Sequence, residues 1–499
     1  MEYGQALRFF ADAQNDVSRL GQKVVYWSGW DGTEREILGG MKRFREPVSP
    51  PEQGFLLPPS VNEFVGADAP VRVVWEVVQR LDVSGLEARH KGGGAPAYAP
   101  RMLLSVLLYA YSEGLRSSRK IERALQTNVE YMFLSGMSRP DYRTIARFRR
   151  ENEVALSGLF VQVVRLCQEL GLVLMEHVAV DGTKVRADVS ARETYRKDRL
   201  EKALASVEER VRRAFEEAEE VDAREDEEHG DKRGDELPEE LKDATRRQER
   251  LKQAFEKLKE TGHKAVASTD LDARVMKTND GNRAAYNGQA VVDREHQVIV
   301  AADVTQDCTD HRQLPKMVEQ TAENTGAYPQ QTTADCGYHS VDTLAFIERT
   351  GLDAYVPVHG KKATKEDGCT YDPVSDAYTN EAKEVLTYRG LDEKKGKTYR
   401  VYRGKRKRSE PFSELYVRQD GQLQQRMQAR LESETGKDIY RYRQQVVEPV
   451  FGHLKTRFGL RRFLLRGLSG ARIEFLLACM VHNIDKIVRY ADRRDLAAA

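Results

Sequence analysis

Two short apolar runs, each ended by an aspartate and then a glycine, constrain the fold of this chain more than any other feature. The first is His-Val-Ala-Val-Asp181-Gly, and the second is Gln-Gln-Thr-Thr-Ala-Asp335-Cys-Gly. A run of this kind that is closed by glycine is typical of a β-strand that ends in a turn. We therefore expect Asp181 and Asp335 at strand ends, where they can meet at one edge of a sheet.

A third acidic residue lies far along the chain, in the segment Arg-Gln-Gln-Val-Val-Glu448-Pro-Val-Phe-Gly-His-Leu-Lys455. A lone glutamate among apolar and basic residues is most often a surface group that pairs with a lysine or arginine. Beside Asp181 and Asp335, however, Glu448 would complete a set of three carboxylates, which repel one another unless divalent cations neutralise them. Carboxylate oxygens suit Mg²⁺ or Mn²⁺, and two such ions can clamp a phosphodiester for in-line attack.

The motifs around these acids, taken in order, resemble those of the DDE transposases of bacterial insertion sequences. The similar branch has a helical N-terminal domain, an Asp-Gly-Thr first motif, an Asp-x-Gly-Tyr second motif and a third motif of Tyr, Arg, Glu and Lys. The resemblance covers residues 41–490 of this chain. It implies that Asp181, Asp335 and Glu448 are catalytic and that they bind Mg²⁺, for which Mn²⁺ can substitute. The implied partner is double-stranded DNA, both the terminal inverted repeats and the target.

The third motif of this family has the spacing Tyr-x2-Arg-x3-Glu-x6-Lys, and the resemblance assigns DNA contacts to its tyrosine, arginine and lysine. Glu448 and Lys455 keep this spacing, whereas Tyr440 and Arg443 lie one residue too early. On a regular helix that shift rotates both residues by about 100°. Proline bends helices, so a bulge at Pro449 could return Tyr440 and Arg443 to the face of Glu448.

The pattern between residues 176 and 358 predicts three strands and then helix, strand, helix, strand. Two β-rich runs, residues 285–293 and 297–305, are joined by a short turn and predict a hairpin. With a further helix after the last strand, this order is that of an RNase H-like fold. The predicted class is therefore α/β, with an RNase H-like catalytic core, an all-helical N-terminal DNA-binding domain and a charged helical insertion. Asn287 matches a family position near the acids, although a strand-edge asparagine explains it equally well. Lys184 is expected to be an ordinary strand-end residue.

The N-terminal third has apolar residues at three- and four-residue intervals, which predicts helices. In the fourth of them Arg143, Arg147 and Arg150 share one face, while Ile145 and Phe148 share the opposite face. This arrangement resembles a helix-turn-helix that binds DNA through its arginines, and in the family this region reads the transposon end. The alternative is a solvated basic face on an ordinary helical bundle. The helices are expected at residues 71–82, 101–115, 118–127, 141–151 and 153–171.

Composition shifts along the chain predict its division into segments. The insertion at 190–262 is rich in both charges and predicts a two-helix hairpin or a floppy insertion, to which we assign no DNA contact. The basic, tyrosine-bearing insertion at 359–420 is irregular; we expect it to contact DNA, the alternative being an exposed β-hairpin with a solvated basic turn. The expected segments are an extension and proline-rich linker (1–60), a helical DNA-binding domain (61–175), the first part of the core (176–358), the basic insertion (359–420), the C-terminal helices of the core (421–490) and a tail (491–499).

Bulk composition limits the function further. The chain has 499 residues, of which 32% are charged, and it lacks the long apolar run of a membrane span and a secretory signal at its N-terminus. Five scattered cysteines indicate a reducing, cytoplasmic setting rather than a zinc site. The net charge of +1 hides a concentration of bases in the N-terminal helices and the C-terminal third. We therefore predict a cytoplasmic DNA transposase that acts as a homodimer, because transposition joins two ends. The alternatives are a nuclease of the same fold that does not join strands, and a non-catalytic DNA-binding protein derived from a transposase.

Overall fold

The structure is a computed structural model that describes residues 60–88, 97–229, 239–358, 368–372, 375–394, 397–404 and 414–491. The expected N-terminal extension and linker, apart from Ser60, lie outside the described residues, as does the tail from residue 492. The basic turn at residues 405–413 also lies outside them.

The described residues between 61 and 169 are mostly helical, as predicted. Short helices at Ser84–Glu87 (α3) and Val129–Ser135 (α6) were not expected from the pattern. The helix with the arginine face begins where Pro-Asp141 predicts, because the Asp141 side chain accepts a hydrogen bond from the Thr144 amide at 2.7 Å. The other elements here are η1 (Val61–Phe64), α2 (Pro70–Arg80), α4 (Pro100–Ser112), α5 (Ser118–Thr127), α7 (Tyr142–Glu151) and α8 (Glu153–Glu169).

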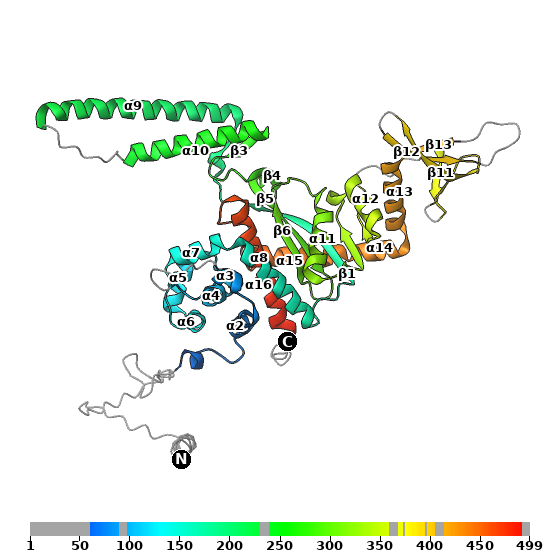
Figure 1. The fold of residues 1–499 in the computed structure, drawn as a ribbon, viewed down its shortest axis with the longest axis horizontal. Coiled ribbons are helices and arrows are strands. Elements are labelled where there is room, and N and C mark those ends of the chain that lie inside the picture. The colour runs from blue at the N-terminus through cyan, green and yellow to red at the C-terminus, as the bar shows by residue number, and fades with distance from the viewer. Residues whose placement is uncertain are drawn as a thin grey trace, which may run out of the picture. The chain divides into compact units, whose positions relative to one another are not determined.

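The central sheet contains the predicted hairpin. Strand β1 (His177–Arg186) pairs antiparallel with β5 (Gly281–Asp293), which pairs antiparallel with β6 (Ile299–Thr305). On its other side β1 pairs in parallel with β7 (Gln331–Ala334), and β7 pairs in parallel with β8 (Asp353–Tyr355). Helices α11 (Gln313–Thr325) and α12 (Val341–Thr350) provide the crossovers into the parallel strands, and β4 (Arg274–Thr278) pairs with the start of β5 (Figure 1).

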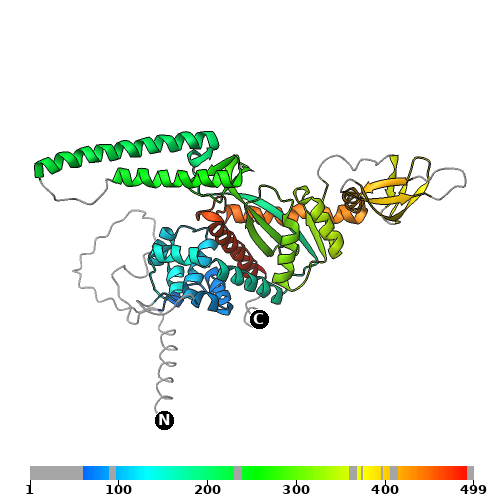
Figure 2. The same cartoon turned by 45° about the horizontal axis from the view of Figure 1, so that its top comes forward.

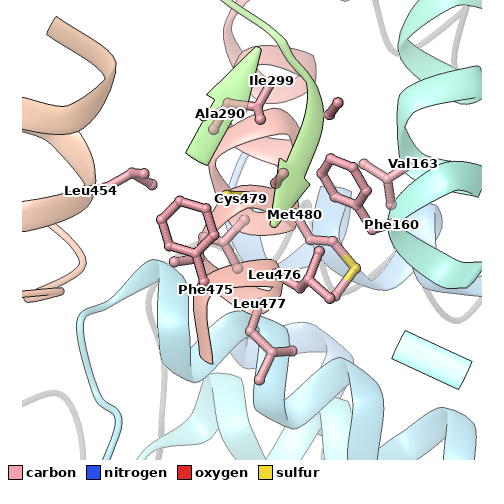
Figure 3. Close-up of a cluster of buried hydrophobic side chains, with 14 of the residues drawn as sticks. Phe160, Val163, Ala290, Ile299, Leu454, Phe475, Leu476, Leu477, Cys479 and Met480 are labelled. Carbon is pink, nitrogen blue, oxygen red and sulfur yellow. The ribbon is translucent and has the colours of Figure 1, made fainter. Parts of the chain in front are cut away.

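Helix α16 (Gly467–Tyr490) is buried along most of its length, from Gly470 to Ile487. It lies between β6 on one side and α4 and α8 on the other. Figure 3 shows Phe475, Leu477 and Met480 of this helix amid side chains from α8, β5 and β6. The N-terminal helices and the sheet therefore share one hydrophobic core. No helix among the described residues is long and apolar enough to cross a membrane.

One glycine is required by this packing. A Cβ atom on Gly288, in β5, would lie 2.7 Å from the nearest ring carbon of Phe475. Since carbon atoms in contact are about 3.5–4.0 Å apart, any larger residue at this position would push α16 away from the sheet.

The charged insertion is the two-helix hairpin that was one of the two predicted alternatives. Helices α9 (Lys197–His229) and α10 (Glu239–Thr261) pack on each other through a small core of their own, which includes Leu200, Val207 and Leu251 (Figure 2). Strands β2 (Thr194–Arg196) and β3 (Ala265–Ala267) pair antiparallel at the base of the hairpin.

The sequence predicted that the basic insertion is irregular. This prediction was wrong, because the insertion contains a five-stranded antiparallel sheet. Buried Tyr378 and Tyr402 form the centre of its core, with ring centroids 4.8 Å apart. The tyrosines that had indicated a DNA-contacting loop are thus partly core residues. The strands are β9 (Thr370–Asp372), β10 (Ala377–Thr379), β11 (Val385–Lys394), β12 (Lys397–Arg403) and β13 (Glu414–Arg418).

The segment expected to be one helix around Glu448 is three helices: α13 (Gln419–Glu432), α14 (Glu434–Arg441) and α15 (Arg443–Thr456). Ser433 separates the first two and caps α14, and Tyr442 separates α14 from α15. Pro449, at which a bulge was suggested, lies inside α15. The boundary between α14 and α15, at Tyr442, lies directly before Arg443.

Candidate active site

Asp181 and Asp335 lie side by side because of the strand register. The parallel pairing of β1 with β7 ends with Val180 opposite Ala334, and each aspartate is the next residue of its strand. Neighbouring strands are about 4.8 Å apart, so the two carboxylates leave the same edge of the pair together. The expectation that Asp181 ends its strand was wrong, since β1 continues through Gly182 to Arg186. Asp335 does end its strand and caps the 3₁₀ turn η3 (Cys336–Tyr338).

The glycines of both motifs are explained by close approach. A Cβ on Gly182 would lie 2.5 Å from Nε2 of Gln289 and 2.8 Å from Oδ1 of Asp310. A Cβ on Gly337 would lie 2.9 Å from Oδ1 of Asp335, whose carboxylate accepts a hydrogen bond from the Gly337 amide at 2.8 Å. A side chain at either position would therefore displace the acidic groups.

Burial raises the pKa of Asp181 to about 6, and the charge of Asp335 adds to this rise. Arg443 opposes both effects, because its Nη1 lies 3.2 Å from Oδ2 of Asp181. A desolvated carboxylate next to a like charge favours protonation or a cation. In this structure Arg443 supplies the positive charge that faces Asp181.

A third carboxylate, Asp310, lies at this site and was missed by the sequence analysis. Its oxygens accept hydrogen bonds from Nδ2 of Asn287 at 2.6 Å and Nε2 of Gln289 at 2.7 Å, and they pair with Nζ of Lys184 at 3.2 Å. The expected proximity of Asn287 to the acids is thus observed, and Lys184 is an ion-pair partner rather than an ordinary strand-end residue. Asp310 lies just before α11, where it resembles any acid at the start of a helix, so no local pattern singles it out.

The buried Tyr338 reports how close the three carboxylates are. Burial is the main cause that raises the pKa of its phenol, and the charges of Asp310, Asp181 and Asp335 all contribute. Its hydroxyl donates a hydrogen bond to Oε1 of Gln289. Tyr338 therefore links the aspartate pair to the Asp310 network from beneath.

Three of the four residues of the third motif converge on the aspartate pair. Arg443 pairs with Asp181, and its guanidinium lies 5.9 Å from the ring centroid of Tyr440. Burial raises the pKa of Tyr440, with Arg443 opposing and Asp335 contributing. Burial lowers the pKa of Lys455, and the charge of Asp181 opposes that change. Tyr442, between α14 and α15, keeps right-handed helical dihedral angles (φ −76°, ψ −15°), so Tyr440 and Arg443 lie nearly one helical turn apart.

Glu448 does not meet the aspartates in this structure. It lies on α15 between Arg443 and Lys455, and α15 packs against β1, but its side chain is exposed and has no hydrogen bond or ion pair with any described residue. On the helix it lies about 20° around and about 10 Å along from Lys455. No group of three or more His, Cys, Asp or Glu among the described residues is arranged to hold a metal ion. The expected meeting of three acids is therefore observed for Asp181 and Asp335 and not for Glu448.

The donor set of the aspartate pair fits a hard divalent cation. Asp181 and Asp335 offer carboxylate oxygens at one strand edge, where burial and the charge of Asp335 both raise the pKa of Asp181. Such oxygens are the ligands that Mg²⁺ and Mn²⁺ prefer. Asp310 is already satisfied by three donors and is better placed to orient the site than to bind the ion.

The predicted arginine face of α7 is present. Arg143, Arg147 and Arg150 are exposed, while Ile145 is buried on the opposite face. Arg149, which lies between Arg147 and Arg150 in sequence, is buried and takes part in an ion-pair network inside the protein. With Arg116 it pairs with the buried Glu474 of α16, at 3.5 and 3.6 Å respectively.

Two family models match parts of this chain. Residues 261–484 match a family model described as "Transposase DDE domain", and residues 59–151 match one described as "Transposase domain (DUF772)". Asp335 and Glu448 lie within the first match, the arginine face of α7 lies within the second, and Asp181 lies between the two. Searches of curated proteins and of solved structures found no match.

Proposed function

Because this chain belongs to the DDE transposases that carry an N-terminal helical domain, we propose that it cuts DNA at the ends of an insertion sequence and joins those ends to target DNA. The observation that carries the proposal is the parallel register that sets Asp181 beside Asp335. The cationic side chains of Arg443 and Lys455 next to that pair give a phosphodiester a place to bind.

We infer that the sheet is an RNase H-like core. The supporting feature is the strand order β6-β5-β1-β7-β8, with β5 and β6 antiparallel and β7 and β8 parallel to their neighbours. In this arrangement the first long strand lies at the centre and carries the first acid, while the next parallel strand carries the second. The charged helical hairpin and the five-stranded sheet are insertions into that core.

Asp181 and Asp335 would hold a divalent cation, Mg²⁺ or Mn²⁺, and we propose Glu448 as the third carboxylate. This role for Glu448 is supported by its position on α15, the helix that also brings Arg443 and Lys455 to the aspartate pair. When bound, the cation stabilises charge on the reacting phosphate and lowers the pKa of the attacking water or 3′-hydroxyl. Asp181 must be deprotonated to bind the cation. Arg443 opposes the rise in the pKa of Asp181 and therefore favours the ionised carboxylate.

Other groups hold and orient the DNA. Lys455 and Arg443 would contact the reacting phosphate, with Tyr440 against the guanidinium of Arg443. The exposed face of Arg143, Arg147 and Arg150 would bind the terminal inverted repeat, since arginines on one helix face suit both phosphates and base edges. A homodimer on DNA follows from the need to join two ends, and a cytoplasmic protein would reach the chromosome directly.

The test is cleavage of a duplex that ends in the inverted repeat flanking the gene, in the presence of Mg²⁺. D181N and D335N should abolish cleavage and retain duplex binding, while D342N, which changes an exposed acid of α12, should leave both unchanged. Cleavage by either site variant at the wild-type rate would refute the assignment. E448Q should also be inactive; an active E448Q would remove Glu448 from the site.

A second assay separates the alternatives. With ends cut in advance, a transposase joins the 3′-hydroxyl to target DNA, whereas a nuclease of the same fold gives no joined product. A protein that binds the inverted repeat but neither cuts nor joins it would be the non-catalytic alternative.

A further inference from the structure

An arginine-lined cavity of about 540 Å³ lies at the base of the α9–α10 hairpin, away from the aspartate pair. The end of β1, the β4–β5 turn, the start of α9 and the loop after α15 all contribute to it. Among the described residues that line it, one is acidic, Asp198, and five are arginines: Arg186, Arg196, Arg199, Arg283 and Arg462. We call this feature the arginine cavity.

The arginines of the cavity are incompletely neutralised. Arg186 pairs with Asp280 at 3.1 Å, and Arg462 pairs with Asp188 at 3.5 Å, but all four side chains are partly or well exposed, where such pairs contribute little. The side chains of Arg196 and Arg283 are exposed and form no hydrogen bond or ion pair with any residue that the structure describes. The cavity therefore presents positive charge to solvent.

A neighbouring hollow extends this charge along the hairpin. It shares Tyr195 and Arg199 with the arginine cavity and adds three basic residues, Arg192, Lys202 and Arg247, and one acidic residue, Glu193. The Nε atom of Arg247 is buried and has no hydrogen-bond partner among the described residues. A buried donor without a partner is costly, and an anion in this hollow would relieve that cost.

Basic residues recur along the chain from Lys455, on α15, to Arg462, which lines the arginine cavity. Lys455 lies near Asp181 and also within the electrostatic influence of Arg461. The next residue, Arg462, forms a parallel bridge with Arg186, and the amide of Phe463 donates to the Arg186 carbonyl at 2.8 Å. The loop after α15 is thus fixed to the end of the strand that carries Asp181.

The geometry also gives a spacing. Asp181 and Arg186 are five residues apart on one strand, which is about 16 Å at the rise of a β-strand. Duplex DNA rises about 3.4 Å per base pair, so this separation corresponds to about five base pairs.

We propose that the arginine cavity binds the phosphodiester backbone of DNA, about five base pairs from the phosphate that reacts at Asp181 and Asp335. This inference rests on the proposed function, because it places a second stretch of the same DNA. It also gives the charged insertion a role that the sequence did not assign: its base contributes Arg196, Arg199 and Lys202.

The test measures salt-dependent binding of the full chain to a random-sequence DNA duplex by fluorescence anisotropy. Each phosphate contact contributes about 0.9 to the slope of log K against log salt concentration. R196Q/R283Q should therefore lower the slope by about 2, and R196K/R283K should restore most of it. The matched control is R210Q/R250Q, which removes the same charge from exposed arginines of α9 and α10 that do not line the cavity.

The outcomes separate the inference from the function on which it rests. A wild-type slope in R196Q/R283Q, with duplex binding intact, would overturn the cavity as a DNA site and leave the transposase proposal standing. An equal loss in R210Q/R250Q would show a general charge effect and also overturn it. A wild-type chain that binds no duplex at all would refute the proposed function itself.

A second measurement tests the position. Neutral methylphosphonates are placed one at a time along a duplex that carries the inverted repeat flanking the gene. Wild-type binding should weaken when the substitution lies about five nucleotides from the cleaved bond, and R186Q, which changes the arginine used for that spacing, should be insensitive to the same substitution. Equal sensitivity of both proteins at that position would contradict the assignment.

Discussion

Replacing Arg149 by methionine should destabilise the protein, whereas replacing Arg147 by glutamine should leave its stability unchanged and weaken DNA binding. The two residues are neighbours in α7, but Arg149 is buried and Arg147 is exposed. Nη1 of Arg149 donates to the Tyr111 hydroxyl at 3.1 Å and the Arg116 carbonyl at 2.8 Å, and it lies 3.5 Å from Oε1 of Glu474.

The expected loss in the free energy of unfolding of R149M follows from the burial of this network. Removing one partner of a buried ion pair costs about 3–5 kcal/mol. Arg116 remains 3.6 Å from Glu474 after the change, so we place R149M near the lower end, at about 3 kcal/mol. The free energy of unfolding of R147Q should lie within about 0.5 kcal/mol of the wild-type value, as is usual for surface substitutions.

The loss should depend on pH. Burial raises the pKa of Glu474 and both arginines oppose the rise, so R149M raises that pKa further. A carboxyl whose pKa is higher in the folded state than in the unfolded state is costly when ionised. The destabilisation should therefore be largest at neutral pH and shrink as pH falls through the pKa of Glu474.

Urea unfolding, followed by tryptophan fluorescence and far-UV circular dichroism at neutral and mildly acidic pH, measures these differences. The double variant R149M/E474Q completes a cycle and should recover about 1–3 kcal/mol of the expected additive loss. Equal stability of R149M and R147Q, or a loss that grows at acidic pH, would refute the reasoning.

Three further predictions concern the site and the core. R443Q should shift the acidic limb of the cleavage pH profile upward, because without Arg443 the pKa of Asp181 rises above about 6; an unshifted profile would contradict this pairing. D310N should lower cleavage and retain duplex binding, since it weakens the hydrogen bonds that orient the site; a wild-type turnover rate would exclude that role. G288A should cost about 1–3 kcal/mol in urea unfolding, because its Cβ would overlap Phe475; an additional F475L substitution should recover part of this loss.

Much of the fold was predictable because its signals are local. The helical periods of the N-terminal third, the hairpin of β5 and β6, and the strands that lead to Asp181 and Asp335 all appear in windows of ten to twenty residues. The predicted faces of α7 and the two-helix insertion followed from the same periodicity. The five-stranded sheet was missed because its strands are short and charged, with their core supplied by tyrosines such as Tyr378 and Tyr402 that also suit a DNA-binding loop.

The sequence by itself determined the family, the main secondary structure and the identity of the two aspartates, since motif order and strand endings are written along the chain. Only the tertiary structure decided what surrounds them. It placed Asp310 at the site, left Glu448 exposed on α15, and brought Arg443 to Asp181. The position of each of these side chains depends on how segments far apart in sequence pack together. Strand register and helix breaks are set by that packing, which local patterns of residues do not encode.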